Sequence, residues 1–183
     1  MAYGPILLAY TADQCQSLIR AAEDSGETFK RGVPVKLDAQ GMVAVVDSTW
    51  SAADVIYGIS AEAAHNLTTD NTEEGGYNEA TPPNQTGRTI PAGAWMRDGK
   101  IGVYKADNQN VFIGSVKSDQ TMAQSYILSA TVYGLTYDSS SGYWYVDLTD
   151  TSGNNACVIL DGVVPGDTSK VYFHFESAQR YWD

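Results

Sequence analysis

The sequence predicts a mainly β fold with little helix: two small units, each like a β-barrel or a β-sandwich, preceded by an N-terminal arm. Two observations support this class. Short runs recur in which apolar and polar residues alternate, as at Trp144, Val146 and Leu148. Clusters of Gly, Asp, Asn and Ser separate these runs, as expected for short strands joined by turns. The 183 residues, 43% of them hydrophobic, are enough for one large domain or two small ones.

Residues 1–26 form the predicted arm. Gly4 and Pro5 oppose a helix at its start, and residues 6–8 are apolar without an evident partner. Residues 14–23 favour one or two helical turns, with Leu18 and Ile19 on one side. Two placements stay open for this arm: packing on a neighbouring molecule, or packing on the chain's own core.

Residues 27–117 form the predicted β-rich domain. Its first element is a hairpin over residues 31–47, whose turn is Asp38-Ala39-Gln40-Gly41. A strand is expected at 55–59, a long polar loop at 68–90, and further strands at 94–96, 100–104 and 111–116.

Residues 118–183 form the predicted C-terminal small β-barrel or sandwich, after a polar joint at 118–124. The apolar run 126–135 is interpreted as one long strand. The other strands are expected at 143–148, 157–160 and 171–175, the last with Val171, Phe173 and Phe175 facing inward.

The charge distribution argues against a nucleic-acid partner. The formal net charge is −11, and no Lys or Arg occurs between Lys36 and Arg88 or between Lys117 and Lys170. A nucleic-acid binder needs a basic stripe to neutralise phosphates. No stretch reaches transmembrane length, and no secretion signal is evident at the start, so the sequence predicts no membrane partner.

Candidate catalytic and metal-binding residues are few. His65 and His174 show no pattern that brings them together, and no nucleophile elbow or phosphate-binding loop occurs. Neither a cofactor nor a metal site is predicted. Two alternatives compete with purely structural roles for the acidic residues: a hydrolase that uses the acids of the long loop, and a calcium site in place of turn-capping aspartates. The residues concerned are Glu73, Glu74 and Glu79 for the hydrolase, and Asp147, Asp150 and Asp161 for calcium.

The two cysteines fit a protein made in a reducing cytoplasm. Cys15 and Cys157 match no metal-ligand spacing, and a disulfide between them is possible without being implied. Because Cys157 opens the apolar run Cys157-Val158-Ile159-Leu160, a buried free thiol is expected there.

Several segments carry a resemblance to a known family. They are residues 26–35 (GETFKRGVPV), 53–60 (ADVIYGIS), 133–135 (YGL), 142–147 (GYWYVD) and 171–175 (VYFHF). Together with the short arm, this pattern resembles the capsid decoration, or cement, proteins of tailed bacteriophages. The loop 68–90 carries none of the resemblance.

The resemblance implies a structural, non-enzymatic subunit made in the host bacterial cytoplasm. It implies binding to the major capsid protein on the outer surface of the virion, where the subunit cements neighbouring capsomers, commonly as a homotrimer. We hypothesise that apolar residues near both termini make the capsid or inter-subunit contacts: Tyr3, Ile6, Leu7, Tyr10, Tyr181 and Trp182.

The alternative function is a phage tail or receptor-binding β module that recognises a surface glycan. The chain holds 12 Tyr and 4 Trp, and Tyr143, Tyr145 and Tyr172 are expected on outward strand faces. Aromatic rings there either stack on sugars or simply suit strands. The stacking platforms in this alternative are Trp50, Trp95, Tyr143 or Tyr145.

Overall fold

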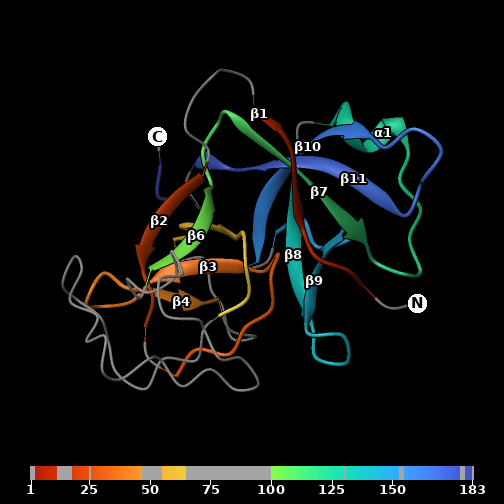
Figure 1. Ribbon diagram of the computed structural model, residues 1–183. Helices are drawn as coiled ribbons and strands as arrows, with labels where there is room; N and C mark the ends of the chain where they lie inside the picture. Colours follow the sequence, from red (N-terminus) through yellow and green to blue (C-terminus); the bar gives the residue numbers. More distant parts are fainter. Residues whose placement is uncertain are drawn as a thin grey trace, which may run out of the picture.

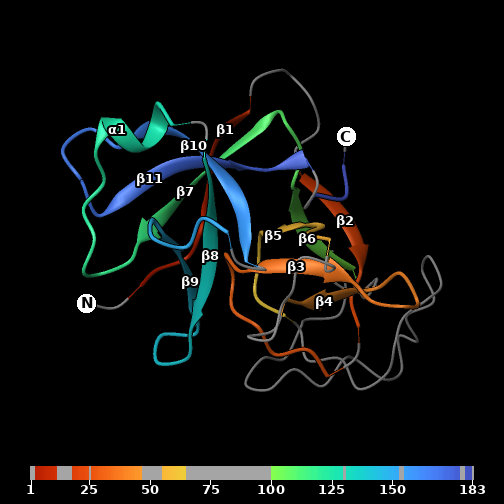
Figure 2. The ribbon, with the colours of Figure 1, turned by 180° about the vertical axis from the view of Figure 1, so that it is seen from behind.

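The computed structural model describes residues 3–11, 18–24, 26–46, 55–64, 100–129, 131–152, 155–177 and 180–182. It is mainly β with little helix, which confirms the predicted fold class. The strands form two sheets that lie side by side, with the C-terminus near the second sheet (Figures 1 and 2).

One sheet closes into a barrel. Its strands are β7 (Asn110–Val116), β8 (Val132–Asp138), β9 (Tyr143–Asp147), β10 (Ala156–Val163) and β11 (Lys170–Phe175). They pair in the order β7-β11-β10-β8-β9, and β9 returns to β7 through a short parallel pairing of Ser115 with Tyr145 and Val116 with Val146. This return closes the ring of five strands.

β1 (Leu7–Thr11) is added to the outside of this ring. It pairs antiparallel with the first half of β7, from Leu7 opposite Ile113 to Thr11 opposite Asn110. β9 pairs with the last two residues of β7, so the two strands share one edge of β7. β1 is therefore the outermost strand of the six-stranded sheet.

The second sheet is not closed by strand pairing within the described residues: its two end strands meet only at one isolated parallel bridge, between Glu23 and Val43. Its order is β2-β6-β5-β3-β4, all antiparallel. The bounds are Leu18–Ala22 for β2, Pro34–Leu37 for β3, Val43–Val45 for β4, Gly58–Ser60 for β5 and Lys100–Lys105 for β6. The predicted hairpin is confirmed: Val35 pairs with Val45, and Asp38 accepts the backbone N–H groups of Gln40 and Met42 across the turn.

Both sheets contribute to one buried core. Phe112, Phe173 and Phe175 fill the barrel, and Val35, Ile59 and Val103 are among those supplied by the open sheet. The expected inward face of β11 is confirmed, since Val171, Phe173 and Phe175 are all fully buried. Among the described residues, no helix is long and apolar enough to cross a membrane.

Two expected elements were wrong. Residues 18–22 are strand β2 and not part of a helix, because they pair along their whole length with β6. The run 126–135 is not one strand: the short helix α1 (Gln124–Ile127) precedes β8, and Tyr133 donates a hydrogen bond back to the carbonyl of Tyr126. The strand expected at 55–59 begins later, at Gly58.

The sheets also group the strands differently from the predicted domains. β7 belongs with β8–β11, although the sequence analysis placed residues 111–116 in the preceding unit. The described residues of the predicted arm divide between the sheets, as β1 and β2, and so pack on the chain's own core. The expected strand at 94–96 and the loop 68–90 lie outside the described residues.

Candidate functional site: an N-terminal contact face and its pocket

The N-terminal segment, residues 3–11, runs along the outside of the barrel and is held by specific contacts. The Tyr3 ring stacks on Tyr145 of β9 at 4.5 Å between centroids, and its hydroxyl accepts the Ser118 N–H at 2.9 Å. Ile6 is buried, and its N–H donates to the Gly32 carbonyl at 2.9 Å. These contacts place β1 on the surface of the barrel.

Strand β1 presents apolar side chains to solvent. Leu7 is 40% exposed and Tyr10 is 53% exposed, although both belong to a strand of sequence Leu-Leu-Ala-Tyr-Thr without any charge. Among the described strands, only β7 pairs with β1, so its other edge has no strand beside it in this part of the chain. Natural proteins usually protect edge strands with charged residues or proline, and an unprotected apolar edge often serves as a contact surface.

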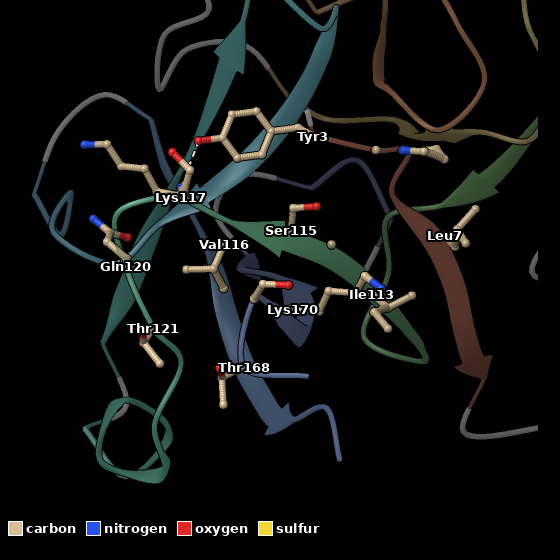
Figure 3. Close-up of a pocket in the computed structure, with 15 residues that line it drawn as sticks. Tyr3, Leu7, Ile113, Ser115, Val116, Lys117, Gln120, Thr121, Thr168 and Lys170 are labelled. Carbon is tan, nitrogen blue, oxygen red and sulfur yellow. Dashed lines mark hydrogen bonds between the residues drawn. The ribbon is translucent and has the colours of Figure 1, made fainter. Parts of the chain in front are cut away.

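A pocket of about 590 Å³ lies beside β1. Tyr3–Pro5 and Leu7 form one wall, and residues 113–116 of β7 form the floor (Figure 3). The remaining lining residues are Lys117, Ser118, Gln120 and Thr121 of the following loop, and residues 168–170, which lead into β11. Because Leu7 belongs both to the exposed strand and to the pocket, the two features form one continuous face. We call it the N-terminal face.

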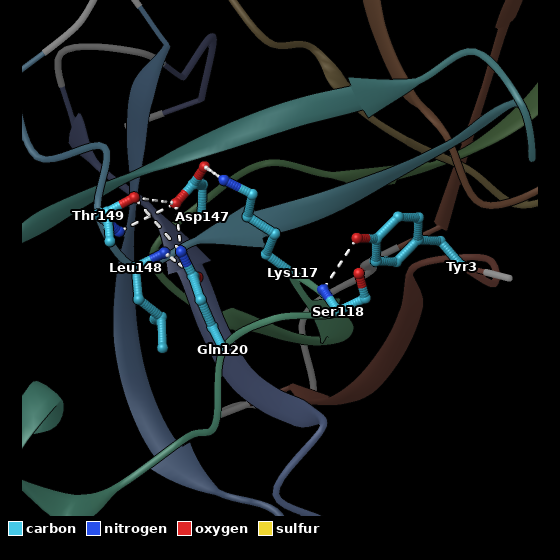
Figure 4. Close-up of polar contacts among 7 residues, drawn as sticks. All are labelled: Tyr3, Lys117, Ser118, Gln120, Asp147, Leu148 and Thr149. Carbon is cyan, nitrogen blue, oxygen red and sulfur yellow. Dashed lines mark hydrogen bonds and ion pairs between the residues drawn. The ribbon is translucent and has the colours of Figure 1, made fainter. Parts of the chain in front are cut away.

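A polar cluster around Asp147 fixes the loop that borders the pocket (Figure 4). One carboxylate oxygen accepts hydrogen bonds from the Gln120 side-chain amide at 2.7 Å and the Thr149 hydroxyl at 2.7 Å. The other oxygen accepts a hydrogen bond from Lys117 Nζ at 3.1 Å. The side-chain oxygen of Gln120, Oε1, accepts a hydrogen bond from the Leu148 N–H. We call this group the Asp147 clamp.

The clamp holds Asp147 ionised. Burial alone would raise the pKa of this carboxyl, but the hydrogen bonds from Thr149, Gln120 and Lys117 together bring the pKa well below its ordinary value. The hydrogen bond to Asp147 also raises the pKa of Lys117. The loop at 117–121 is therefore tied to β9 by a charged network that persists through the neutral pH range.

The six predicted contact residues fall into two places. Leu7 and Tyr10 are exposed on β1, while Ile6 is buried and unavailable to a partner in this conformation. The other pair lies away from β1: Trp182 donates to the Tyr57 carbonyl at 3.0 Å, and the Tyr181 ring meets Tyr57 edge-on at 5.1 Å. No partner chain is present, so contact by any of the six stays a prediction.

The tyrosines proposed for glycan stacking are partly engaged by the chain itself. Tyr145 stacks on Tyr3, and Lys30 Nζ lies 5.0 Å from the centre of the Tyr143 ring. Tyr172 lies 6.4 Å from Tyr10, ring to ring. Trp50 and Trp95 lie outside the described residues. The described tyrosines therefore do not form a shared open platform.

Among the described residues, the candidate catalytic and metal-binding side chains do not come together in one place. His174 pairs with Asp161 at 2.8 Å, whereas Asp147 belongs to its clamp, and no group of three potential metal ligands is found in the described part of the chain. Asp147 accepts the Thr149 N–H, which is the turn-capping role weighed against calcium. His65 and the loop acids Glu73, Glu74 and Glu79 lie outside the described residues.

Cys157 is a free and fully buried thiol, as expected. Burial raises its pKa well above the ordinary value, so the thiol stays protonated and unreactive at neutral pH. Cys15 lies outside the described residues.

The comparisons with known proteins add no family. No family model, no curated protein and no solved structure matches this chain.

The pocket and the Asp147 clamp were missed by the sequence analysis. The only local signal for the clamp was Asp147 two residues before Thr149, a spacing typical of a side-chain-capped turn. Nothing local indicated that Lys117, Gln120 and Tyr3 would meet at the same loop.

Proposed function

We propose that this protein is a structural virion protein that binds the outer surface of a bacteriophage capsid and cements neighbouring capsomers. The observation that carries the proposal is the exposed, uncharged strand β1, with Leu7 and Tyr10 directed to solvent from a closed barrel. The sequence resemblance to decoration proteins supports the same role. In this proposal the protein acts by presenting a contact surface and catalyses no reaction.

The construction of the N-terminal face suits repeated docking. A closed barrel has no free edges of its own, so the added strand β1 is the edge that the barrel offers to a partner. Tyr3, Ile6 and the Asp147 clamp hold the start of the chain in place, which reduces the entropy lost when a partner binds. If three copies assemble on the shell, as we propose, modest contacts multiply through effective concentration.

The test uses expanded capsids that lack this protein, together with the purified full-length chain. We expect wild-type protein to saturate a fixed number of sites per capsid. The double variant Leu7→Asp, Tyr10→Asp is expected to bind at least about tenfold more weakly, because it charges the centre of the proposed contact.

Leu128→Asp is the matched control, since Leu128 is a 79% exposed leucine in the turn after α1, a segment that does not pair with β1. It should bind like wild type. Equal binding by the double variant and wild type would place the contact elsewhere, and no binding by wild type would remove the cement function.

A further inference from the structure

The pocket of the N-terminal face is rich in uncommitted hydroxyl groups. Ser115, Ser118, Thr121 and Thr168 all line it, and within the described part of the chain no hydrogen bond engages their hydroxyls. A serine or threonine hydroxyl both donates and accepts. The pocket therefore offers donors and acceptors together.

The charge of the pocket is balanced. Lys117 and Lys170 are its charged lining residues among those described, and each is already paired: Lys117 with Asp147 at 3.1 Å and Lys170 with Asp167 at 2.9 Å. Figure 4 shows the Lys117 side chain directed toward Asp147 and away from Tyr3. A phosphate or another multiply charged anion would have to compete with these carboxylates, so the balance favours an uncharged ligand.

The pocket also has an apolar side. Pro5, Leu7 and Ile113 lie along the wall and floor next to β1, and Figure 3 places Leu7 and Ile113 on the same side of the pocket. A pyranose ring combines hydroxyl groups at its edge with a C–H face that packs on apolar surface. The volume of about 590 Å³ falls in the usual range for small-molecule sites.

We propose that this pocket binds an uncharged saccharide, with the hydroxyls of Ser115 and Thr168 as hydrogen-bonding partners and the Leu7–Ile113 side as packing surface. The site differs from the aromatic platforms considered from the sequence, because among the described residues neither Tyr143 nor Tyr145 lines the pocket, although Tyr145 stacks on Tyr3, which does. The pocket shares Leu7 with the proposed capsid contact, but Ser115 and Thr168 lie outside that contact, so substitution at Thr168 tests saccharide binding separately from capsid binding.

The test is a titration of isotope-labelled full-length protein, monitored by the amide signals in NMR spectra. Five sugars are added in separate titrations: glucose, galactose, mannose, N-acetylglucosamine and lactose. Inorganic phosphate is titrated in parallel. We expect at least one sugar to give saturable shifts centred on residues 113–118 and 168–170. Thr168→Val, which removes one hydroxyl at nearly constant shape, should weaken that binding about fivefold.

Thr136→Val is the matched control, because Thr136 lies on β8 outside the pocket, and it should bind like wild type. An amide spectrum that resembles that of the wild-type protein verifies the fold of each variant. Three outcomes overturn the proposal: no sugar saturates, phosphate alone binds, or the shifts centre on Tyr143 and Tyr172 instead of the pocket.

Discussion

The two sheets of this protein solve the problem of strand edges differently. The barrel joins β9 to β7 and so gives each of its five strands two neighbours, with a core that includes the mutually packed rings of Phe112, Phe173 and Phe175. The other sheet ends on β2 and β4, which among the described residues meet only at the isolated bridge of the fully buried Glu23 with Val43. Its side of the shared core is mostly aliphatic, and further acids lie close to the β4 edge. We infer that the closed barrel is the support on which the proposed contact face and pocket are built.

The largest expected effect comes from the aromatic core of the barrel. Phe173→Ala should lower the free energy of unfolding by about 3–5 kcal/mol, because it removes a fully buried ring and leaves a cavity between Phe112 and Phe175. Val35→Ala in the open sheet removes two buried carbons and should cost about 2 kcal/mol. Urea unfolding followed by circular dichroism measures both, and a larger loss for Val35→Ala would contradict the proposed division.

The junction between the two sheets gives the next effect. Gly32 has a φ of +79°, and a Cβ there would meet the Pro5 side chain and lie 2.7 Å from the Ile6 carbonyl oxygen. Gly32→Ala should therefore cost about 2–4 kcal/mol from left-handed strain and overpacking. It should also loosen the N-terminal segment, as faster proteolysis at residues 3–11 would report.

Gly41→Ala separates these two causes. Gly41 also has a positive φ, +82°, but open space surrounds the position of its Cβ. This variant should show the backbone strain alone, about 1–2 kcal/mol, without faster proteolysis of the N-terminal segment. Equal losses for the two glycines would mean that Gly32 does not couple the sheets.

The Asp147 clamp supplies an intermediate effect. Asp147→Asn should lower the unfolding free energy by about 1.5–3 kcal/mol at pH 7, because it removes charge-assisted hydrogen bonds to a mostly buried carboxylate. The folded-state pKa of Asp147 is depressed, so its stabilisation is present above the unfolded pKa of about 4 and is lost as pH falls below it. The difference between wild type and Asp147→Asn should therefore shrink in acid.

Asp138→Asn is the control for the clamp. Asp138 also has a lowered pKa, from hydrogen bonds with Ser141 and Ser140, but it caps an exposed turn. Its substitution should cost less than that of Asp147. An Asp147→Asn variant as stable as wild type at pH 7 would show that the clamp does not hold the loop.

The smallest effect belongs to the acids near β4. Burial raises the pKa of Glu27, and the charges of Asp24, Glu23 and Asp38 raise it further, against the hydrogen bond from the Val45 N–H. A raised folded-state pKa means that this group lowers stability as pH rises from the unfolded pKa of about 4.3 through the folded value. Glu27→Gln keeps an acceptor and removes the charge.

We therefore expect Glu27→Gln to be more stable than wild type at pH 7, by less than about 1 kcal/mol because the site is half exposed to solvent. Near pH 4 the two should be equal. Unfolding midpoints at the two pH values measure this, and a destabilised variant at pH 7 would mean that the carboxylate is needed for the Val45 hydrogen bond.

Local patterns predicted the strands that bury alternate residues. β9 and β11 follow the expected alternation, and the hairpin of β3 and β4 follows from its turn residues. β2 was missed because Leu18–Ala22 has a helix-compatible composition, which pairing with β6 overrides. The run 126–135 was misinterpreted because it lacks Gly and Pro before Gly134, so no local signal separates α1 from β8.

The candidate site was predicted only in part. Leu7 and Tyr10 were chosen as apolar residues without a local partner, and the structure leaves both exposed. Ile6 looked the same in the sequence but is buried, because the segment lies against Gly32. The pocket unites residues 3–7, 113–121 and 168–170, a convergence that depends on barrel closure and has no local signature.

The most direct test of the proposed function is the copy number of this protein in purified virions, measured by quantitative mass spectrometry against the major capsid protein. A ratio near one, or a simple fraction of one, is the result we predict for a protein that tiles the head. A few copies per particle would instead place it on the tail, and its absence from virions would contradict the proposal outright.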